Sequence, residues 1–131
     1  MKVYDNQGRL KISTTGGVSV VDPKVSITIE NPTSSEDVTI FYAKDAITVA
    51  QMSCVLLGSS TPSVTWTIRY AADRSAAGTE VVTSGTTTTS VTTGDKVTAF
   101  NAENIPANSW VWMETTAQSG TVTEINITIN Y

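Results

Sequence analysis

Apolar and polar residues alternate along most of this chain. The clearest example is the segment 63–70, in which the apolar or aromatic residues are Val64, Trp66, Ile68 and Tyr70 and the others are polar. Because successive side chains of a strand point to opposite faces, this pattern predicts a strand with one buried face. The same period of two recurs up to residue 131, and convincing helix-forming stretches are absent. The sequence therefore predicts an all-β fold.

Turn-forming residues separate about eight such strands after residue 24, at a spacing of roughly 8–12 residues. This spacing predicts a β-sandwich or jelly roll of antiparallel strands rather than a barrel around a ligand cavity. The most apolar segment, 47–57, is predicted to be a central strand buried on both faces. We expect turns at 58–62 and at 117–120, the second joining the last two strands.

The final strand and the loop 71–78 carry two further predictions. Ile125, Ile127 and Ile129 share one face of the final strand, and we expect them to point into the core beside Trp66 and Ile68. The loop is expected to contain at most a single helical turn, for which the best candidate is Asp73–Ala77.

Residues 1–24 differ from the sandwich domain expected over residues 25–131. The turn-forming segment 5–8 lies between two short apolar pieces, so the arm is predicted to be a small hairpin or an extended segment. Its apolar residues are too few to form a core of their own, and leaving them exposed would create an adhesive edge strand. We therefore expect the arm to add a strand to its own domain or to a partner. The partner-binding candidates are Leu10, Ile12, Val18, Val20 and Val21.

Composition argues against several classes of partner. The 131 residues fit one domain and carry a formal charge of −4. The eight Lys and Arg residues are scattered, which argues against nucleic-acid binding because phosphates require a clustered basic surface. No apolar run approaches a membrane span or a signal peptide, so we expect synthesis in a cytoplasm.

The chain lacks the side chains that most often perform catalysis. It contains no histidine and one cysteine, Cys54, which we expect to be a buried thiol. Glu36, Asp37 and Asp45 could bind Ca²⁺ if a hairpin brought them together, although solvated turn residues are the simpler interpretation. We expect no catalytic residue, cofactor or metal.

The three tryptophans allow more than one interpretation. Trp66 is expected in the core. Trp110 and Trp112 share one face of their strand, with Val111 and Met113 on the other. We expect this pair to contact the core or another subunit; contact with a ligand such as a sugar ring is the alternative.

Several segments of the sequence together resemble a known family. They are 46–49, 62–70, the threonine-rich 86–93, 98–101, 105–107, 110–114 and 124–129. In this combination the chain resembles the small β-sandwich virion proteins of tailed bacteriophages and cyanophages. These occur as capsid cement (decoration) proteins and as tail or neck-fibre domains. The resemblance covers about two-thirds of the chain and implies no catalytic residues.

The resemblance implies a structural role in the virion, after synthesis in the host cytoplasm. The expected function is a capsid cement protein that binds and stabilises the lattice of the major capsid protein. Self-association is expected as well, with a trimer favoured. The alternatives are a tail or neck fibre that binds host-surface glycan, and a carbohydrate-binding module.

Overall fold

The computed structural model describes residues 3–4, 10–11 and 23–131, and every regular element in them is a strand. Residues 73–77 form a turn, closed by a hydrogen bond from the Ala76 N–H to the Asp73 carbonyl at 3.1 Å. The all-β prediction is confirmed, and the described part contains no helix that could cross a membrane. The strands are β1 (Val3–Tyr4), β2 (Leu10–Lys11), β3 (Lys24–Glu30), β4 (Asp37–Ala43), β5 (Ile47–Thr48), β6 (Gln51–Ala71), β7 (Thr79–Glu80), β8 (Thr86–Thr88), β9 (Asp95–Val97), β10 (Asn104–Ile105) and β11 (Ser109–Asn130).

The short strands β1 and β2 pair in antiparallel orientation, with Val3 opposite Lys11 and Tyr4 opposite Leu10. Of the two alternatives for the N-terminal arm, this pairing agrees with the hairpin. The other four arm residues predicted to bind a partner, Ile12 and the three valines between 18 and 21, lie outside the described residues.

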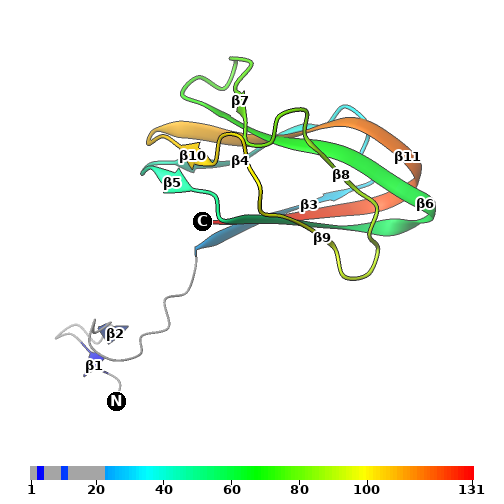
Figure 1. The fold of residues 1–131 in the computed structure, drawn as a ribbon, viewed down its shortest axis with the longest axis horizontal. Helices are drawn as coiled ribbons and strands as arrows, with labels where there is room; N and C mark the ends of the chain where they lie inside the picture. The colour runs from blue at the N-terminus through cyan, green and yellow to red at the C-terminus, as the bar shows by residue number, and fades with distance from the viewer. Residues whose placement is uncertain (1–2, 5–9, 12–22) are drawn as a thin grey trace.

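Two very long strands, β6 and β11, organise the remainder of the chain. They pair in antiparallel orientation from Ala71 opposite Trp110 at one end to Gln51 opposite Asn130 at the other. Both strands bend midway and return in a second layer (Figure 1). The β6–β11 pair therefore supplies the two central strands of both layers of a β-sandwich.

Shorter strands complete each layer. In the first layer, β3 and β9 flank the part of the β6–β11 pair formed by residues 51–57 and 124–130. In the second layer, β4 lies on one side of residues 63–71 and 109–119, while β7 and β8 lie on the other. The remaining strands of residues 23–131, β5 and β10, pair with each other and with no other described strand.

The two predicted turns are wrong, because the bend does not interrupt either long strand. Close approach of the two backbones at the bend requires glycine: a Cβ on Gly58 would lie 2.0 Å from the Thr121 carbonyl oxygen. Gly120 has a φ of 68°, and Ser60 and Thr61 also adopt positive φ. These residues are common in turns, but here they bend a paired ribbon whose register shifts repeatedly in this region.

The expected strand 47–57 is also wrong in its extent and burial. The chain leaves regular structure at Val49 and Ala50, whose N–H groups donate to the carbonyls of Glu103 and Asn130. Within β6 burial then alternates, so only one face is in the core. The continuous apolar pattern reflects half-buried Val55 and exposed Leu57 on the outer face.

The core lies between the two layers and contains the predicted isoleucines. Ile125, Ile127 and Ile129 are each 1% exposed, and Trp66 and Ile68 belong to the same buried cluster. The Trp66 indole N–H donates to the Thr88 hydroxyl at 3.0 Å, so the buried ring leaves no polar group unpaired. These sequence predictions are confirmed.

Truncation of Ile127 to alanine is predicted to lower the free energy of unfolding by about 2–5 kcal/mol, because it removes a fully buried side chain. Chemical denaturation measures the change. The neighbouring variant Thr128→Ala, on the outer face, serves as the control and should cost less than about 1 kcal/mol. A loss below about half a kcal/mol for Ile127→Ala would contradict the burial of this row.

Candidate interaction surface

The strands β3 and β4 form a free edge on one side of the sandwich. Each pairs with β11 alone among the described strands. They lie on the same side because the link between them wraps the bend: the Asn31 N–H donates to the Thr123 carbonyl, and Thr115 exchanges hydrogen bonds with the link residues Thr33 and Glu36. We call this side the β3–β4 edge.

The core is incompletely covered along β3. The apolar row of β3 and the apolar row of β11 lie side by side on the same inner face. Val25 is opposite Ile129, Ile27 is opposite Ile127, and Ile29 is opposite Ile125. The three β11 residues are fully buried, whereas their three partners on β3 are only half-buried. Phe41 of β4, stacked on Tyr131 at 6.0 Å between ring centroids, is half-buried as well. An additional strand beyond β3 would extend the buried face.

The hydrogen-bond pattern shows which main-chain groups of β3 point away from β11. At its two ends, the Asn31 N–H donates to Thr123 and the Pro23 carbonyl accepts from Tyr131. Because an antiparallel strand directs alternate residues to alternate neighbours, the odd-numbered residues of β3 bond to β11. Ser26 and Thr28 therefore direct their N–H and carbonyl groups to the free edge.

The opposite side of the sandwich is protected. Its strands β7, β8 and β9 span two or three residues each. The intervening loops bond to β6, as in the hydrogen bonds from Leu56 N–H to the Ser90 carbonyl and from Val81 N–H to the Ile68 carbonyl. Short strands and covering loops are common protections against edge pairing. The seven-residue β3 contains no internal proline or charge, and none of the described segments covers its edge.

The outer face of the second layer carries Trp112, which is completely buried. The loop 72–78 covers it so closely that a Cβ on Gly78 would lie 2.4 Å from the indole ring. The Arg74 guanidinium lies 4.4 Å from the ring centroid and pairs with Asp37, an arrangement that favours a cation–π contact. Trp112 is thus covered by its own chain, which removes it from the candidates for ligand or subunit contact.

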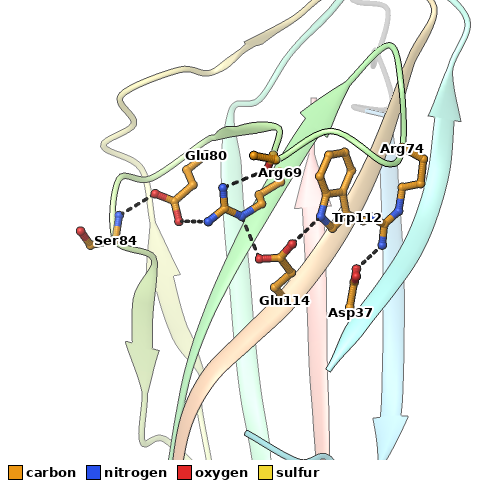
Figure 2. A network of polar contacts seen from close by, with 8 residues as sticks. Asp37, Arg69, Arg74, Glu80, Ser84, Trp112 and Glu114 are labelled. Atoms are coloured by element: carbon orange, nitrogen blue, oxygen red, sulfur yellow. Dashed lines mark hydrogen bonds and ion pairs between the residues drawn. The ribbon is translucent and has the colours of Figure 1, made fainter. Parts of the chain in front are cut away.

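A polar network beside Trp112 holds this loop in place (Figure 2), because the Arg69 guanidinium at its centre donates to the Ala77 carbonyl at 3.1 Å. Arg69 donates to Glu114 at 2.8 Å and to Glu80 at 3.0 Å, and the second oxygen of Glu114 accepts from the Trp112 indole N–H at 2.8 Å. The second oxygen of Glu80 accepts from the Ser84 backbone N–H at 3.0 Å. Both carboxylate oxygens of Glu80 and both of Glu114 accept hydrogen bonds, so the network holds the neighbouring loops in position.

Trp110, two residues earlier, remains exposed. It is 39% exposed and packs at a tilt against Tyr42, which is 44% exposed, with ring centroids 4.8 Å apart. The Tyr42 hydroxyl donates to the Asn108 side chain at 3.2 Å. Together these two rings form an aromatic pair on the outer face, and it is the one part of the predicted Trp110/Trp112 contact that is accessible.

Sequence analysis missed Tyr42 for a specific reason. The simple alternation places Tyr42 on the face of Val38 and Ile40, but the register between β4 and β11 shifts at Ile40, which has no partner. Beyond this irregularity Phe41 faces the core and Tyr42 faces out. Two adjacent aromatic residues, of which only one can face inward, were the available signal.

The carboxylates considered for Ca²⁺ do not assemble into a site. Glu36 accepts hydrogen bonds from Thr33, and Asp37 pairs with Arg74. In the described ranges no three residues among His, Cys, Asp and Glu form a group suited to a metal ion. A shallow open depression on the outer face of the first layer is lined by Ser53, Cys54, Val55, Thr93, Gly94, Asn126 and Thr128. None of these side chains is charged.

Cys54 is 1% exposed, as predicted from the sequence. Burial raises the pKa of its thiol from 9.0 to about 12, against a smaller lowering effect of the hydrogen bond with Thr88. The thiolate is the reactive form, so this side chain is chemically inert in the folded protein.

Comparison of the chain with protein-family models, with curated proteins and with solved structures finds no match.

The raised pKa predicts that a thiol reagent will modify Cys54 at pH 8 only after denaturant unfolds the chain. Because folding keeps the thiol protonated up to about pH 12, its contribution to stability declines as the pH rises above the unfolded pKa of 9. Absorbance of the released reagent group measures the reaction. Ser59→Cys, at an exposed position, should react immediately and acts as the control; equally rapid reaction of Cys54 would contradict its burial.

Proposed function

We propose that this chain is a structural virion protein of a tailed phage that decorates the capsid by binding its major capsid protein. The observation that carries the proposal is the β3–β4 edge, an unprotected strand with a half-buried apolar row. Soluble proteins usually protect such edges, and strand addition is a common mode of peptide capture. The family resemblance supports a place in the virion, since the similar proteins include capsid cement proteins as well as tail and neck-fibre domains.

The N-terminal arm supports the same proposal. It joins the body at Pro23, at the beginning of β3, and contains Leu10 and Ile12 at the spacing of two that places both side chains on one face of a strand. An arm of this kind can exchange main-chain hydrogen bonds with a neighbour. Repetition of the contact around a symmetric oligomer and across a lattice converts weak contacts into stable attachment.

The charged groups of the outer face also fit a structural role. Arg69, Glu80 and Glu114 are satisfied by one another and by loop groups. Arg74 closes the loop over Trp112. These interactions rigidify a surface, which suits a protein that must hold its shape on a particle.

Removal of residues 1–22 is predicted to abolish binding to purified particles of the phage, while the sandwich stays folded because its core lies in residues 43–129. Co-sedimentation with particles measures binding, and near-ultraviolet circular dichroism measures folding. Val91→Ala in the full chain, at an exposed apolar position outside the arm and the β3–β4 edge, is the control and should still co-sediment. Normal decoration by the truncated protein would contradict the arm's role, and location at the tail alone would replace the capsid by the fibre alternative.

The aromatic pair of Trp110 and Tyr42 favours one second candidate, a glycan-binding fibre or carbohydrate-binding module. Exposed flat rings beside an amide group suit stacking and hydrogen bonding to a sugar. If this is the function, the isolated protein will bind immobilised glycans, and Trp110→Ala will lower the affinity at least tenfold. Val91→Ala, at another exposed apolar position, is the matched control. Absence of binding to any glycan would exclude this candidate.

A further inference from the structure

We propose that the β1–β2 hairpin of a second copy of this chain occupies the β3–β4 edge, with β2 adding as a strand beside β3. This inference rests on the proposed self-association and specifies both of its surfaces. Each copy then donates a hairpin through one element and accepts a hairpin through another.

The accepting surface has the geometry of strand addition. The free main-chain groups of Ser26 and Thr28 face outward, as the pairing of β3 with β11 requires. The inner row formed by Val25, Ile27 and Ile29 is half-buried for lack of a further strand. An added strand would satisfy the free groups and extend the cover over this row.

The donated strand β2 matches the accepting surface in its pattern of apolar and polar residues. Leu10 and Ile12 alternate with Arg9, Lys11 and Ser13, so a strand through these residues presents one apolar and one polar face. The apolar face continues the half-buried row, and the polar face continues the outer face beside Ser26 and Thr28.

Charge favours the same pairing. The arm contains three basic residues, Lys2, Arg9 and Lys11, against two acidic residues. The remainder of the chain contains five basic and ten acidic residues. A mildly basic arm is therefore attracted to the acidic body of another copy, an effect that steers association.

The junction with the body favours a second copy over the arm's own body. The Tyr131 N–H donates to the Pro23 carbonyl at 2.9 Å, so extended pairing begins at Pro23. Among the described strands of the single chain, moreover, β2 pairs with β1 and with no other.

The connecting segment is long enough for the exchange. Residues 12–22 separate β2 from Pro23 and span up to about 40 Å when extended, which exceeds the width of a small domain. Because the donor and acceptor surfaces differ, the contact is heterologous, and it forms a ring of few copies where the rotation between neighbouring copies closes. The favoured trimer is one such ring.

A proline placed at Thr28 tests the accepting surface. It removes an N–H that faces the free edge and leaves the main-chain bonds to β11 intact, at a position of the kind that tolerates proline in edge strands. The Thr28 hydroxyl, which accepts from the Asn126 side chain of β11 at 2.6 Å, is lost as well. Sedimentation equilibrium is expected to show that Thr28→Pro raises the dissociation constant of the oligomer at least tenfold above that of the wild-type protein. Thr28→Val retains the N–H and is the matched control. If Thr28→Pro does not fold, Leu10→Asp with Ile12→Asp, which leaves the sandwich unchanged, gives the same test.

Cross-linking distinguishes a second copy from the same chain. Tagged Lys11→Cys is mixed with untagged Thr28→Cys and treated with a short bis-maleimide; buried Cys54 stays unreactive. A mixed covalent dimer is expected. The double variant Lys11→Cys/Thr28→Cys reports cross-links within one chain. A monomeric wild-type protein, an oligomer insensitive to both arm and edge variants, or cross-linking only within single chains of this double variant would each overturn the inference.

Particle binding separates this inference from the proposed function. An oligomer that requires Thr28 and the arm but does not bind particles would sustain the exchanged hairpin and refute the capsid role. A protein that binds particles as a monomer would sustain the capsid role and refute the exchange.

Discussion

The main-chain pairing of β6 with β11 is the interaction on which the rest of this structure depends. It extends through both layers of the sandwich, and each flanking strand except the separate β5–β10 pair attaches to one of these two strands. The bend places the two halves of the pair face to face, so their inward side chains form the core. The glycines at 58 and 120 make that bend possible because no side chain fits between the two closely paired backbones.

The period of two predicted the fold class and much of the core. It identified the row of Ile125, Ile127 and Ile129 and the buried position of Trp66, because alternate burial is a local property of each strand. It could not show that the bend at 58–62 belongs to a continuous strand. Serine, threonine, glycine and proline occur both in reversing turns and in irregular paired strands, and the difference depends on the partner strand.

The candidate surfaces were less predictable for a related reason. The free edge of β3 depends on strand order, which is set by pairings between residues distant in sequence. Trp112 has the same local pattern as Trp110, yet Gly78 and Arg74 of a distant loop cover one ring and leave the other exposed. Short strands and loops protect one edge of the sandwich, whereas β3 at the opposite edge is unprotected. The opportunities for strand pairing are therefore concentrated on one side of the molecule.

The sharing of β6 and β11 between the layers has a consequence for how the molecule folds and fails. Neither layer can detach as a unit, because each would have to break the same two strands at the bend. The two central strands come from distant parts of the chain. The chain must therefore lose the entropy of closing a long loop before the strands can pair, which is typical of slow-folding β-proteins. Once formed, the sandwich is expected to resist partial opening and to unfold as one cooperative body.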